Sequence, residues 1–331
     1  MSTALLHRPR RFALLAGLSA IVLLGAWFAL GRSWLQPRLG FVEYKMPNPL
    51  DMPTAIAAAP DGTIWFTIDL TDVIGRLRGG KVERLPTHMA NLEPIGLGIA
   101  PDGAAWYTDN AGHAITRVAP EGEVNRFPLD TASVRLGRLA VAADGAAWFA
   151  EETGLSITKF KDGVLTRHIY ESARGGPYGV ALAADGSVWA TLQSGDQLLH
   201  ISADDKMTAL DLPQRNAVAS DIAVAPDGSV WFLEVRADRI AHYANGTFSE
   251  IPVNAHNVGL SGLTIGRDGA IWFGMLRSGA IGRLRAGAIT SFPLPRDHAR
   301  PYTLTTDHEG NVWYADISGY VGMIPAADAE R

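Results

Sequence analysis

The stretch Pro60-Asp61-Gly62-Thr63-Ile64-Trp65-Phe66 carries the pattern that decides the fold of this chain. Its tryptophan recurs six times further on, always three residues after a glycine, at Trp106, Trp148, Trp189, Trp231, Trp272 and Trp313. The successive intervals are 41, 42, 41, 42, 41 and 41 residues. Units of this length cannot bury their own apolar face, so they must stack on one another. Seven such units can close into a ring, and the sequence therefore predicts an all-β, seven-bladed β-propeller.

Each repeat also contains a turn signal between two apolar runs. The signal is Asp-Gly in the first six repeats and Glu309-Gly310 in the seventh; the pairs begin at Asp61, Asp102, Asp144, Asp185, Asp227 and Asp268. Such pairs supply the positive φ values that a tight hairpin needs. Each pair is therefore expected to join two antiparallel strands, with the tryptophan on the second.

Two more strands are expected in each repeat, at 74–77 and 82–86 in the first and at 281–284 and 289–293 in the sixth. Four antiparallel strands make one blade. After Trp313 only one further strand is expected, at 320–324, before the polar tail 326–331. Residues 41–47 resemble the fourth-strand pattern, so we expect the N-terminal strand to complete the last blade. The tryptophans are interpreted as packing between blades rather than as a stacking array for bases or sugars.

Composition limits the chain to one folded domain and a leader. The repeats occupy residues 41–325 of the 331, which leaves no room for a second domain. Residues 1–39 carry five arginines and no acid, so the remainder has 24 basic and 34 acidic residues, a net charge of −10. Binding to phosphate backbones requires a basic surface. Nucleic acid is therefore not an expected partner.

The leader has the pattern of a single membrane span. Residues 1–11 contain Arg8, Arg10 and Arg11, and the 19 residues from Phe12 to Leu30 are uncharged and mostly apolar. At about 1.5 Å per residue, they can cross a bilayer core of about 30 Å. Upstream arginines favour a cytoplasmic N-terminus. We predict a basic cytoplasmic leader at 1–11, a transmembrane anchor at 12–31 and a linker at 32–40, with the propeller periplasmic or extracellular.

A cleaved signal peptide is the alternative for the same segment, with Ala29-Leu30-Gly31 as a small-x-small cleavage site. The apolar run is longer than the roughly 7 to 15 residues of most signal sequences, which favours the uncleaved anchor. Either interpretation places the propeller outside the cytoplasm. The sequence has no cysteine, so ring closure must stabilise the domain without disulfides.

Position within the repeat predicts which residues line the mouth of the central channel. The residue seven places before each turn acid is expected there: Thr54, Ile95, Gly137, Tyr178, Ser220, Ser261 and Tyr302. The next position holds small residues in most repeats, but Arg138 and Asp221 in the third and fifth. This charged pair is interpreted either as a salt bridge in a wet channel or as a ligand contact.

Acidic residues follow several tryptophans by three positions. Glu151, Glu234 and Asp316 stand there and could bind a hard divalent cation, since such ions prefer oxygen ligands. Acidic strand ends on solvated loops are the alternative, because the spacing matches no metal-binding motif.

The repeated Pro-x-Gly, Pro-Asp-Gly, Trp-Phe-Thr and Ile-Gly-Arg elements resemble the streptogramin lyase family, the virginiamycin B lyases. Examples are Pro94-Ile95-Gly96, Pro101-Asp102-Gly103, Trp65-Phe66-Thr67 and Ile281-Gly282-Arg283, and the resemblance covers residues 41–324. It implies a seven-bladed propeller that opens a cyclic depsipeptide by Mg-dependent elimination. That reaction needs a base to remove a proton and a metal to stabilise the enolate.

The family's catalytic residues have no match at the corresponding positions. Its sixth-blade His falls on Ser261, and its Glu-Pro-His falls on Arg300-Pro301-Tyr302. Its last Glu falls on Ile317, with Asp316 beside it. An arginine in place of a metal-binding carboxylate would repel a cation, so the resemblance implies this scaffold with a different chemistry.

The sequence is compatible with three functions. The first is binding of a small molecule or peptide at the channel mouth through Arg138, Tyr178, Asp221, Arg300 and Tyr302, a set that suits an anionic or aromatic ligand. The second is a carbon–oxygen lyase or lactonase with rearranged residues, with Tyr302 and Asp316 as candidate catalytic groups and Mg implied by the resemblance alone. The third is a scaffold whose rim docks a cell-envelope protein.

Overall fold

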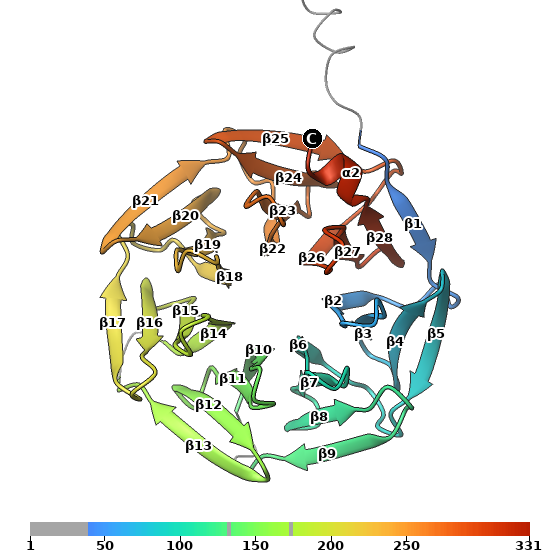
Figure 1. Ribbon diagram of the computed structural model, residues 1–331, viewed down its shortest axis with the longest axis horizontal. Helices are drawn as coiled ribbons and strands as arrows, with labels where there is room; N and C mark the ends of the chain where they lie inside the picture. Colours follow the sequence, from blue (N-terminus) through green and yellow to red (C-terminus); the bar gives the residue numbers. More distant parts are fainter. Residues whose placement is uncertain (1–38, 131–133, 172–174) are drawn as a thin grey trace, which may run out of the picture. The chain divides into compact units, whose positions relative to one another are not determined.

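The structure is a computed structural model that describes residues 39–130, 134–171 and 175–331. Within these ranges the chain forms seven four-stranded antiparallel sheets, arranged as blades around one axis (Figure 1). In the first six blades the strands pair in chain order, with the first strand nearest the axis and the fourth at the rim. The predicted seven-bladed propeller is confirmed.

The first three blades contain strands β2 to β13. Blade 1 comprises β2 (Pro53–Ala58), β3 (Ile64–Ile68), β4 (Val73–Arg78) and β5 (Lys81–Pro86). Blade 2 comprises β6 (Pro94–Ile99), β7 (Ala105–Asp109), β8 (Ala114–Val118) and β9 (Val124–Pro128). Blade 3 comprises β10 (Leu136–Val141), β11 (Ala147–Glu151), β12 (Ser156–Lys161) and β13 (Val164–Ile169).

The next three blades contain strands β14 to β25. Blade 4 comprises β14 (Pro177–Leu182), β15 (Val188–Leu192), β16 (Gln197–Ile201) and β17 (Met207–Asp211). Blade 5 comprises β18 (Ala219–Val224), β19 (Val230–Glu234), β20 (Arg239–Ala244) and β21 (Thr247–Pro252). Blade 6 comprises β22 (Leu260–Ile265), β23 (Ile271–Met275), β24 (Ala280–Arg285) and β25 (Ala288–Pro293).

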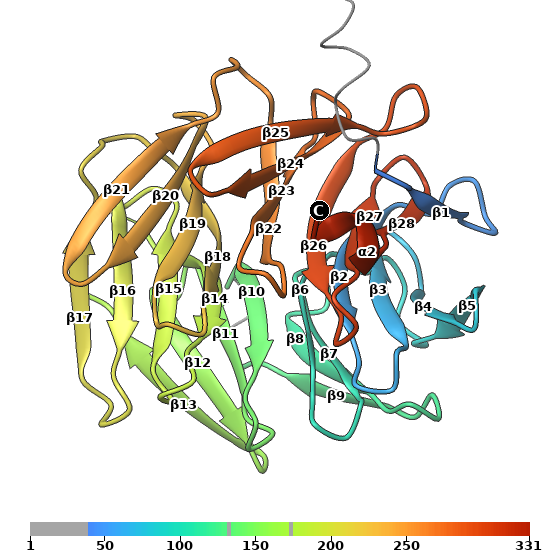
Figure 2. The same ribbon diagram turned by 45° about the horizontal axis from the view of Figure 1, so that its top comes forward.

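Blade 7 joins the two ends of the propeller. Its inner strands are β26 (Pro301–Thr306), β27 (Val312–Asp316) and β28 (Tyr320–Ile324), and its outer strand is β1 (Val42–Lys45). Tyr44 pairs with Val321 in the antiparallel register, and Figure 2 shows the two strands side by side. The predicted closure by the N-terminal strand is confirmed, and it pairs what would otherwise be an open edge of the blade.

A buried arginine holds this closure together. The Arg296 guanidinium lies 3.0 Å from the Glu43 carboxylate on β1 and 2.6 Å from the Asp316 carboxylate at the end of β27. The Tyr314 hydroxyl donates to the same Glu43 at 2.8 Å, and the Arg296 guanidinium packs 3.8 Å from the Tyr320 ring centroid. Because buried charges are costly unless paired, this network ties the two ends of the chain into one unit.

The tryptophans pack between blades, as predicted. Trp65 is 1% exposed and belongs to one buried cluster with Tyr107 and Val118 of blade 2. Trp313 of blade 7 packs in a cluster with Phe66 of blade 1, which completes the ring. A large apolar side chain at a fixed position thus fills each interface between twisted sheets.

The acidic turn pairs form the predicted hairpins, and glycine alone takes the positive φ. In the first repeat, Gly62 has a φ of 82° and its amide donates to the Ala59 carbonyl at 3.0 Å. The Asp61 carboxylate accepts the Thr63 amide at 2.9 Å. The aspartate therefore stabilises the turn through a side-chain acceptor, while glycine provides the left-handed conformation.

The C-terminal segment contains a short helix within the polar tail predicted at 326–331. Residues Ala326–Ala329 form the helix α2, whose first amide donates to the Asn311 side chain at 2.8 Å. Arg283 donates to the Ala329 carbonyl at 3.2 Å, and Asp328 accepts the Gly40 amide at 2.9 Å. The segment is ordered because these side chains satisfy backbone groups at both ends of its single turn.

The predicted leader 1–11, the transmembrane segment 12–31 and most of the linker 32–40 lie outside the described residues. Among the residues that the structure does describe, no helix is long and apolar enough to span a bilayer.

Candidate functional site

The first strand of every blade is interrupted by a register shift, and the candidate site residues stand at these shifts. In blade 3, Leu136 pairs with Glu151 but Leu139 pairs with Phe149, so the first strand carries one extra residue. Arg138 lies inside this bulge. A bulge bends its strand and changes the direction of the side chains in it. The repeat position that we predicted at the channel mouth is therefore a bulge position.

Threonines on the second strands hold these bulges in place. The Gly96 amide donates to Thr108 Oγ1 at 2.9 Å, and Thr108 Oγ1 donates to the Gly137 carbonyl of the next blade at 2.9 Å. Thr191 makes the same pair of contacts, to the Gly179 amide and the Ser220 carbonyl. The backbone groups that the bulges release are thus satisfied, and the bulges of neighbouring blades are fixed relative to one another.

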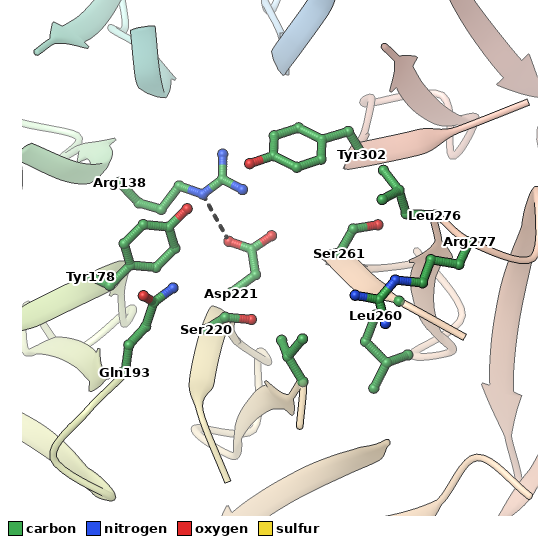
Figure 3. Close-up of a pocket in the computed structure, with 12 residues that line it drawn as sticks. Arg138, Tyr178, Gln193, Ser220, Asp221, Leu260, Ser261, Leu276, Arg277 and Tyr302 are labelled. Atoms are coloured by element: carbon green, nitrogen blue, oxygen red, sulfur yellow. Dashed lines mark ion pairs between the residues drawn. The ribbon is translucent and has the colours of Figure 1, made fainter. Parts of the chain in front are cut away.

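Bulge residues from five blades surround one cavity of about 230 Å³, called here the mouth cavity (Figure 3). Its bulge residues are Arg138 on β10, Tyr178 on β14, Ser220 and Asp221 on β18, Ser261 on β22 and Tyr302 on β26. The remaining wall comprises Gln193, Val235, Gly259, Leu260, Leu276 and Arg277. The sequence prediction that Arg138, Tyr178, Asp221 and Tyr302 lie near the channel mouth matches this arrangement.

Arg138 is at the centre of the cluster. Its Nε lies 3.6 Å from Asp221 Oδ1, and its Nη1 donates to the Ile95 carbonyl at 2.8 Å. The guanidinium carbon is 5.8 Å from the ring centroid of Tyr178 and 5.9 Å from that of Tyr302. Burial lowers the pKa of Arg138, but electrostatic interactions with Tyr178, Asp221 and Tyr302 outweigh it and raise that pKa. The guanidinium is therefore charged at any working pH.

Two polar groups of the mouth cavity are buried without a hydrogen-bond partner, namely Arg138 Nε and Ser220 Oγ. Figure 3 shows the hydroxyl groups of Tyr178 and Tyr302 on either side of the guanidinium, both directed toward it. An unused donor on a cation, beside three hydroxyl groups, is suited to bind an anionic group. Leaving such donors unpaired costs free energy that a ligand can recover.

Arg138 and Asp221 were interpreted either as a salt bridge or as a ligand contact, and the structure shows the first. The ion pair is present, with both side chains mostly buried, at 12% and 16% exposure. Asp221 also accepts the Leu263 amide through Oδ2 at 2.8 Å, which fixes blade 5 to blade 6. Asp221 therefore orients the arginine and links two blades. Direct contact with a ligand stays a prediction.

Arg300 does not join this cluster. Its side chain is exposed and does not line the mouth cavity, whereas its backbone amide donates to Asp316 Oδ2 at 2.8 Å. The residue immediately precedes the β26 strand, so its side chain is not directed by the bulge that directs Tyr302. The predicted contact between Arg300 and a ligand therefore has no support from the mouth cavity and stays a prediction.

The three candidate metal ligands lie at the ends of second strands in three different blades. Glu151 is paired with Arg167 at 3.1 Å, and Asp316 is paired with Arg296 at 2.6 Å. Nowhere in the described ranges do three His, Asp or Glu side chains form a group that could hold a metal ion. The donors nearest the mouth thus do not fit the Mg that the family resemblance implies, because arginines already neutralise two of the carboxylates.

Glu234 differs from its counterparts in blades 3 and 7. It is fully buried, and neither carboxylate oxygen has a hydrogen-bond partner. The arginine that could pair with it, Arg239, contacts Glu250 instead. Burial, followed by the charge of Glu250, raises the pKa of Glu234 to about 7, although Arg239 lowers it.

Sequence reasoning missed two polar members of the mouth cavity. Gln193 stands four residues after Trp189, a repeat position that also supplies Val235 and Leu276 to the cavity wall. Repeat position alone could therefore have identified Gln193. Arg277 follows Leu276 in the loop after β23, where the repeats share no pattern, and only the folded structure identifies it.

The fold and the position of its site define the class of this protein as a seven-bladed β-propeller with a ligand-sized cavity at the channel mouth. Two segments of the chain, residues 35–158 and 80–329, match the sequence profile of the virginiamycin B lyase family. The chain belongs to that family.

Individual relatives show the same relationship. A virginiamycin B lyase of Nocardia farcinica is 33% identical over 202 residues, which cover 61% of this chain and 70% of that protein. A streptogramin B lyase structure superposes with a TM-score of 0.82 at 24% identity, covering 86% of this chain and 97% of the other. A catalytically inactive virginiamycin B lyase of Staphylococcus aureus with quinupristin superposes with a TM-score of 0.81 at 21% identity, covering 86% and 99%.

Proposed function

We propose that this propeller binds a small molecule or peptide at its channel mouth through an anionic group, and that it does so without the catalytic residues of its family. The observation that carries the proposal is the convergence of Arg138, Tyr178, Ser220 and Tyr302 from four blades on one cavity. The charged guanidinium of Arg138 can bind an anion, because its Nε, although ion-paired with Asp221 at 3.6 Å, makes no hydrogen bond.

Two hydroxyl groups of the mouth cavity support binding rather than proton abstraction. Ser261 donates its hydroxyl to the Pro301 carbonyl at 2.9 Å, so its proton is already engaged. Arg138 lowers the pKa of Tyr178, but burial and the interactions with Tyr302 and Asp221 outweigh it, so that pKa lies above its usual value. Tyr178 is therefore protonated near neutral pH and acts as a hydrogen-bond donor.

Calorimetric titration of the protein with phenylacetate, an aromatic carboxylate, tests the proposal. The wild type should bind it, and Arg138→Gln should weaken binding about tenfold or more, because a charge-assisted hydrogen bond is lost. Arg78→Gln is the matched control, since Arg78 pairs with Asp61 at the turn end of blade 1. Equal affinity of the wild type and Arg138→Gln would contradict the proposal.

A carbon–oxygen lyase of the family's type is the second candidate function. It is favoured by one observation: Ser261 and Tyr302, which stand at the family's catalytic positions, both line the mouth cavity. Chromatography of a type B streptogramin incubated with the protein, with and without Mg, tests it, because elimination gives a ring-opened isomer of unchanged mass. Ring opening that is lost in Tyr302→Phe would establish the lyase function, and an intact antibiotic would exclude it for this substrate.

We also propose that residues 12–31 anchor the protein in the membrane, with the propeller periplasmic or extracellular. The support is the uncharged apolar run that follows three arginines. Protease added to spheroplasts, whose cytoplasmic membrane is intact, should degrade the propeller, while carbonate extraction of untreated cells should leave the full-length chain in the membrane fraction. A protease-resistant or freely soluble chain would contradict the anchor.

A further inference from the structure

Three cavities meet around the channel mouth. The mouth cavity shares Tyr302 with a second cavity of about 250 Å³, called here the bridging cavity, which Met52, Thr54, Asp69, Pro94, Ile95 and Ile317 also line. The bridging cavity in turn shares Asp69 and Ile95 with a third of about 480 Å³, called here the acidic cavity. Shared wall residues place the three cavities next to one another in a row, called here the depression, which a ligand that spans several blades can contact.

The two ends of this depression carry opposite charge. In the mouth cavity, Arg138 and Arg277 outnumber Asp221, which leaves an excess of positive charge. In the acidic cavity, Asp69 and Glu93 lie together. That cavity also contains Arg135, whose mostly exposed side chain is directed to Glu152 at 3.5 Å.

The carboxylates of the acidic cavity have no counter-charge of their own. Within the described ranges of the chain, neither Asp69 nor Glu93 forms an ion pair. Burial raises the pKa of Asp69; a hydrogen bond from the Leu70 amide lowers it, and the charge of Glu93 raises it again, with a net increase. Repulsion between the two carboxylates is thus unrelieved. A bound cationic group would relieve it.

An organic ammonium suits these carboxylates better than a metal ion does. A hard divalent metal needs about six oxygen ligands, and the described residues contain no group of three His, Asp or Glu that could hold one. The carboxylates of Asp69 and Glu93 provide acceptors for the N–H donors of an ammonium group, and the remaining donor can bind water.

The wall between the charged ends is mostly apolar and short. Ile95, Ile317 and the Tyr302 ring line it, and the Arg138 guanidinium donates to the Ile95 carbonyl at 2.8 Å. Glu93 lies only two residues before Ile95 on the same segment. An extended peptide covers about 3.3 to 3.6 Å per residue. A chain of about three residues therefore suits the separation between the two ends.

We propose that the ligand of this site is a short linear peptide with free termini, whose carboxylate lies at Arg138 and whose ammonium lies between Asp69 and Glu93. This inference rests on the proposed function and names its substrate class. The apolar wall between the two charges accommodates the side chain of the middle residue.

The tripeptide alanyl-phenylalanyl-alanine tests this proposal when it is compared with its N-acetylated, C-amidated and doubly blocked forms. Calorimetric titration of the full chain in detergent should give the tightest binding for the free tripeptide. Blocking either end should weaken binding about tenfold or more, because each block removes one charge-assisted contact. The doubly blocked form should be the weakest of the four.

Two pairs of variants assign the two ends. In Glu93→Gln, N-acetylation of the tripeptide should no longer lower its affinity, while C-amidation should lower it as in the wild type. The control is Glu121→Gln, at the exposed turn between β8 and β9. In Arg138→Gln, C-amidation of the tripeptide should no longer lower its affinity. The control is Arg78→Gln. If Arg138→Gln does not fold, Arg138→Lys, which keeps the positive charge, should retain a smaller effect of C-amidation.

The outcomes separate this inference from the proposed function. Equal affinity for the free and the N-acetylated tripeptide overturns the ammonium site, and phenylacetate binding that depends on Arg138 would still support the anion site. Binding of phenylacetate but of no tripeptide form overturns the peptide as substrate class. Binding of neither phenylacetate nor any tripeptide overturns both.

Discussion

The two ends of each blade differ in how regularly their residues repeat along the sequence. At the turn end, an acidic residue, a glycine and a tryptophan recur in all seven repeats and make nearly the same contacts in each. At the mouth end, the same repeat position holds Thr54, Tyr178, Ser261 or another residue, and the second strands end in paired or unpaired carboxylates. The repeated end determines the architecture, and the varied end determines the site.

The largest effect is expected where the mouth end closes the ring. Arg296→Ala leaves the buried carboxylate of Asp316 and the partly buried one of Glu43 without their cation, which should lower the free energy of unfolding by about 3 kcal/mol. Urea denaturation measures it. Arg78→Ala at the turn end removes an exposed pair and should cost less than about 1 kcal/mol. Equal losses of unfolding free energy in the two variants would show that the mouth end contributes no more to stability than the turn end.

The next largest effect depends on pH and concerns the unpaired carboxylate at the mouth end. Because burial raises the pKa of Glu234 to about 7, the folded protein binds more protons than the unfolded chain between pH 4.5, the ordinary pKa of a glutamate, and about pH 7. Stability is therefore lost as pH rises through that window. Glu234→Gln should match the wild type in acid and exceed it by up to about 3 kcal/mol above neutral pH.

Glu151→Gln is the matched comparison for this prediction. Glu151 has the partner that Glu234 lacks, with Arg167 at 3.1 Å, so the substitution should destabilise the protein at neutral pH. Thermal unfolding at pH 5 and pH 8 measures both variants. A Glu234→Gln variant that loses stability at pH 8 would show that the buried carboxylate has a favourable partner after all.

The smallest effect is expected for a single turn. Asp61→Ala removes the acceptor of the Thr63 amide and the partner of Arg78 in one of seven equivalent hairpins. The loss should be about 1 kcal/mol, because the amide can bond to water in this exposed turn. Chemical denaturation measures it, with Glu121→Ala as a control. A loss of stability as large as that of Arg296→Ala would show that this turn stabilises the whole propeller and not only its own hairpin.

The sequence predicted the fold closely, because each element of the prediction depends on short-range interactions. Gly62 requires a turn at its position, Trp65 requires an interface, and residues 41–47 match the missing strand of blade 7. The sequence did not show the helix α2 within the tail, since α2 is held by Arg283, which lies far away in sequence. Repeat proteins allow such prediction because each unit contacts mainly its neighbours.

The candidate site was predictable only in part. Repeat position correctly brought Arg138, Tyr178 and Tyr302 to the mouth, since the bulge recurs at the same place in each first strand. It did not show that the side chain of Arg300 stays outside the mouth cavity. Nor did it show that arginines neutralise Glu151 and Asp316, because Arg167 lies on the outer strand β13 and Arg296 in the loop before β26, at positions that share no repeat pattern.

The sequence by itself determined the number of blades, their strands and their closure, because these follow from local turns and from packing between adjacent repeats. Tertiary structure alone decided which charges meet. Arg138 and Tyr302 stand four blades apart along the chain and come together only when the ring closes. Whether a buried carboxylate is paired, like Asp316, or unpaired, like Glu234, is decided in the same way, by side chains that only the completed ring brings within reach.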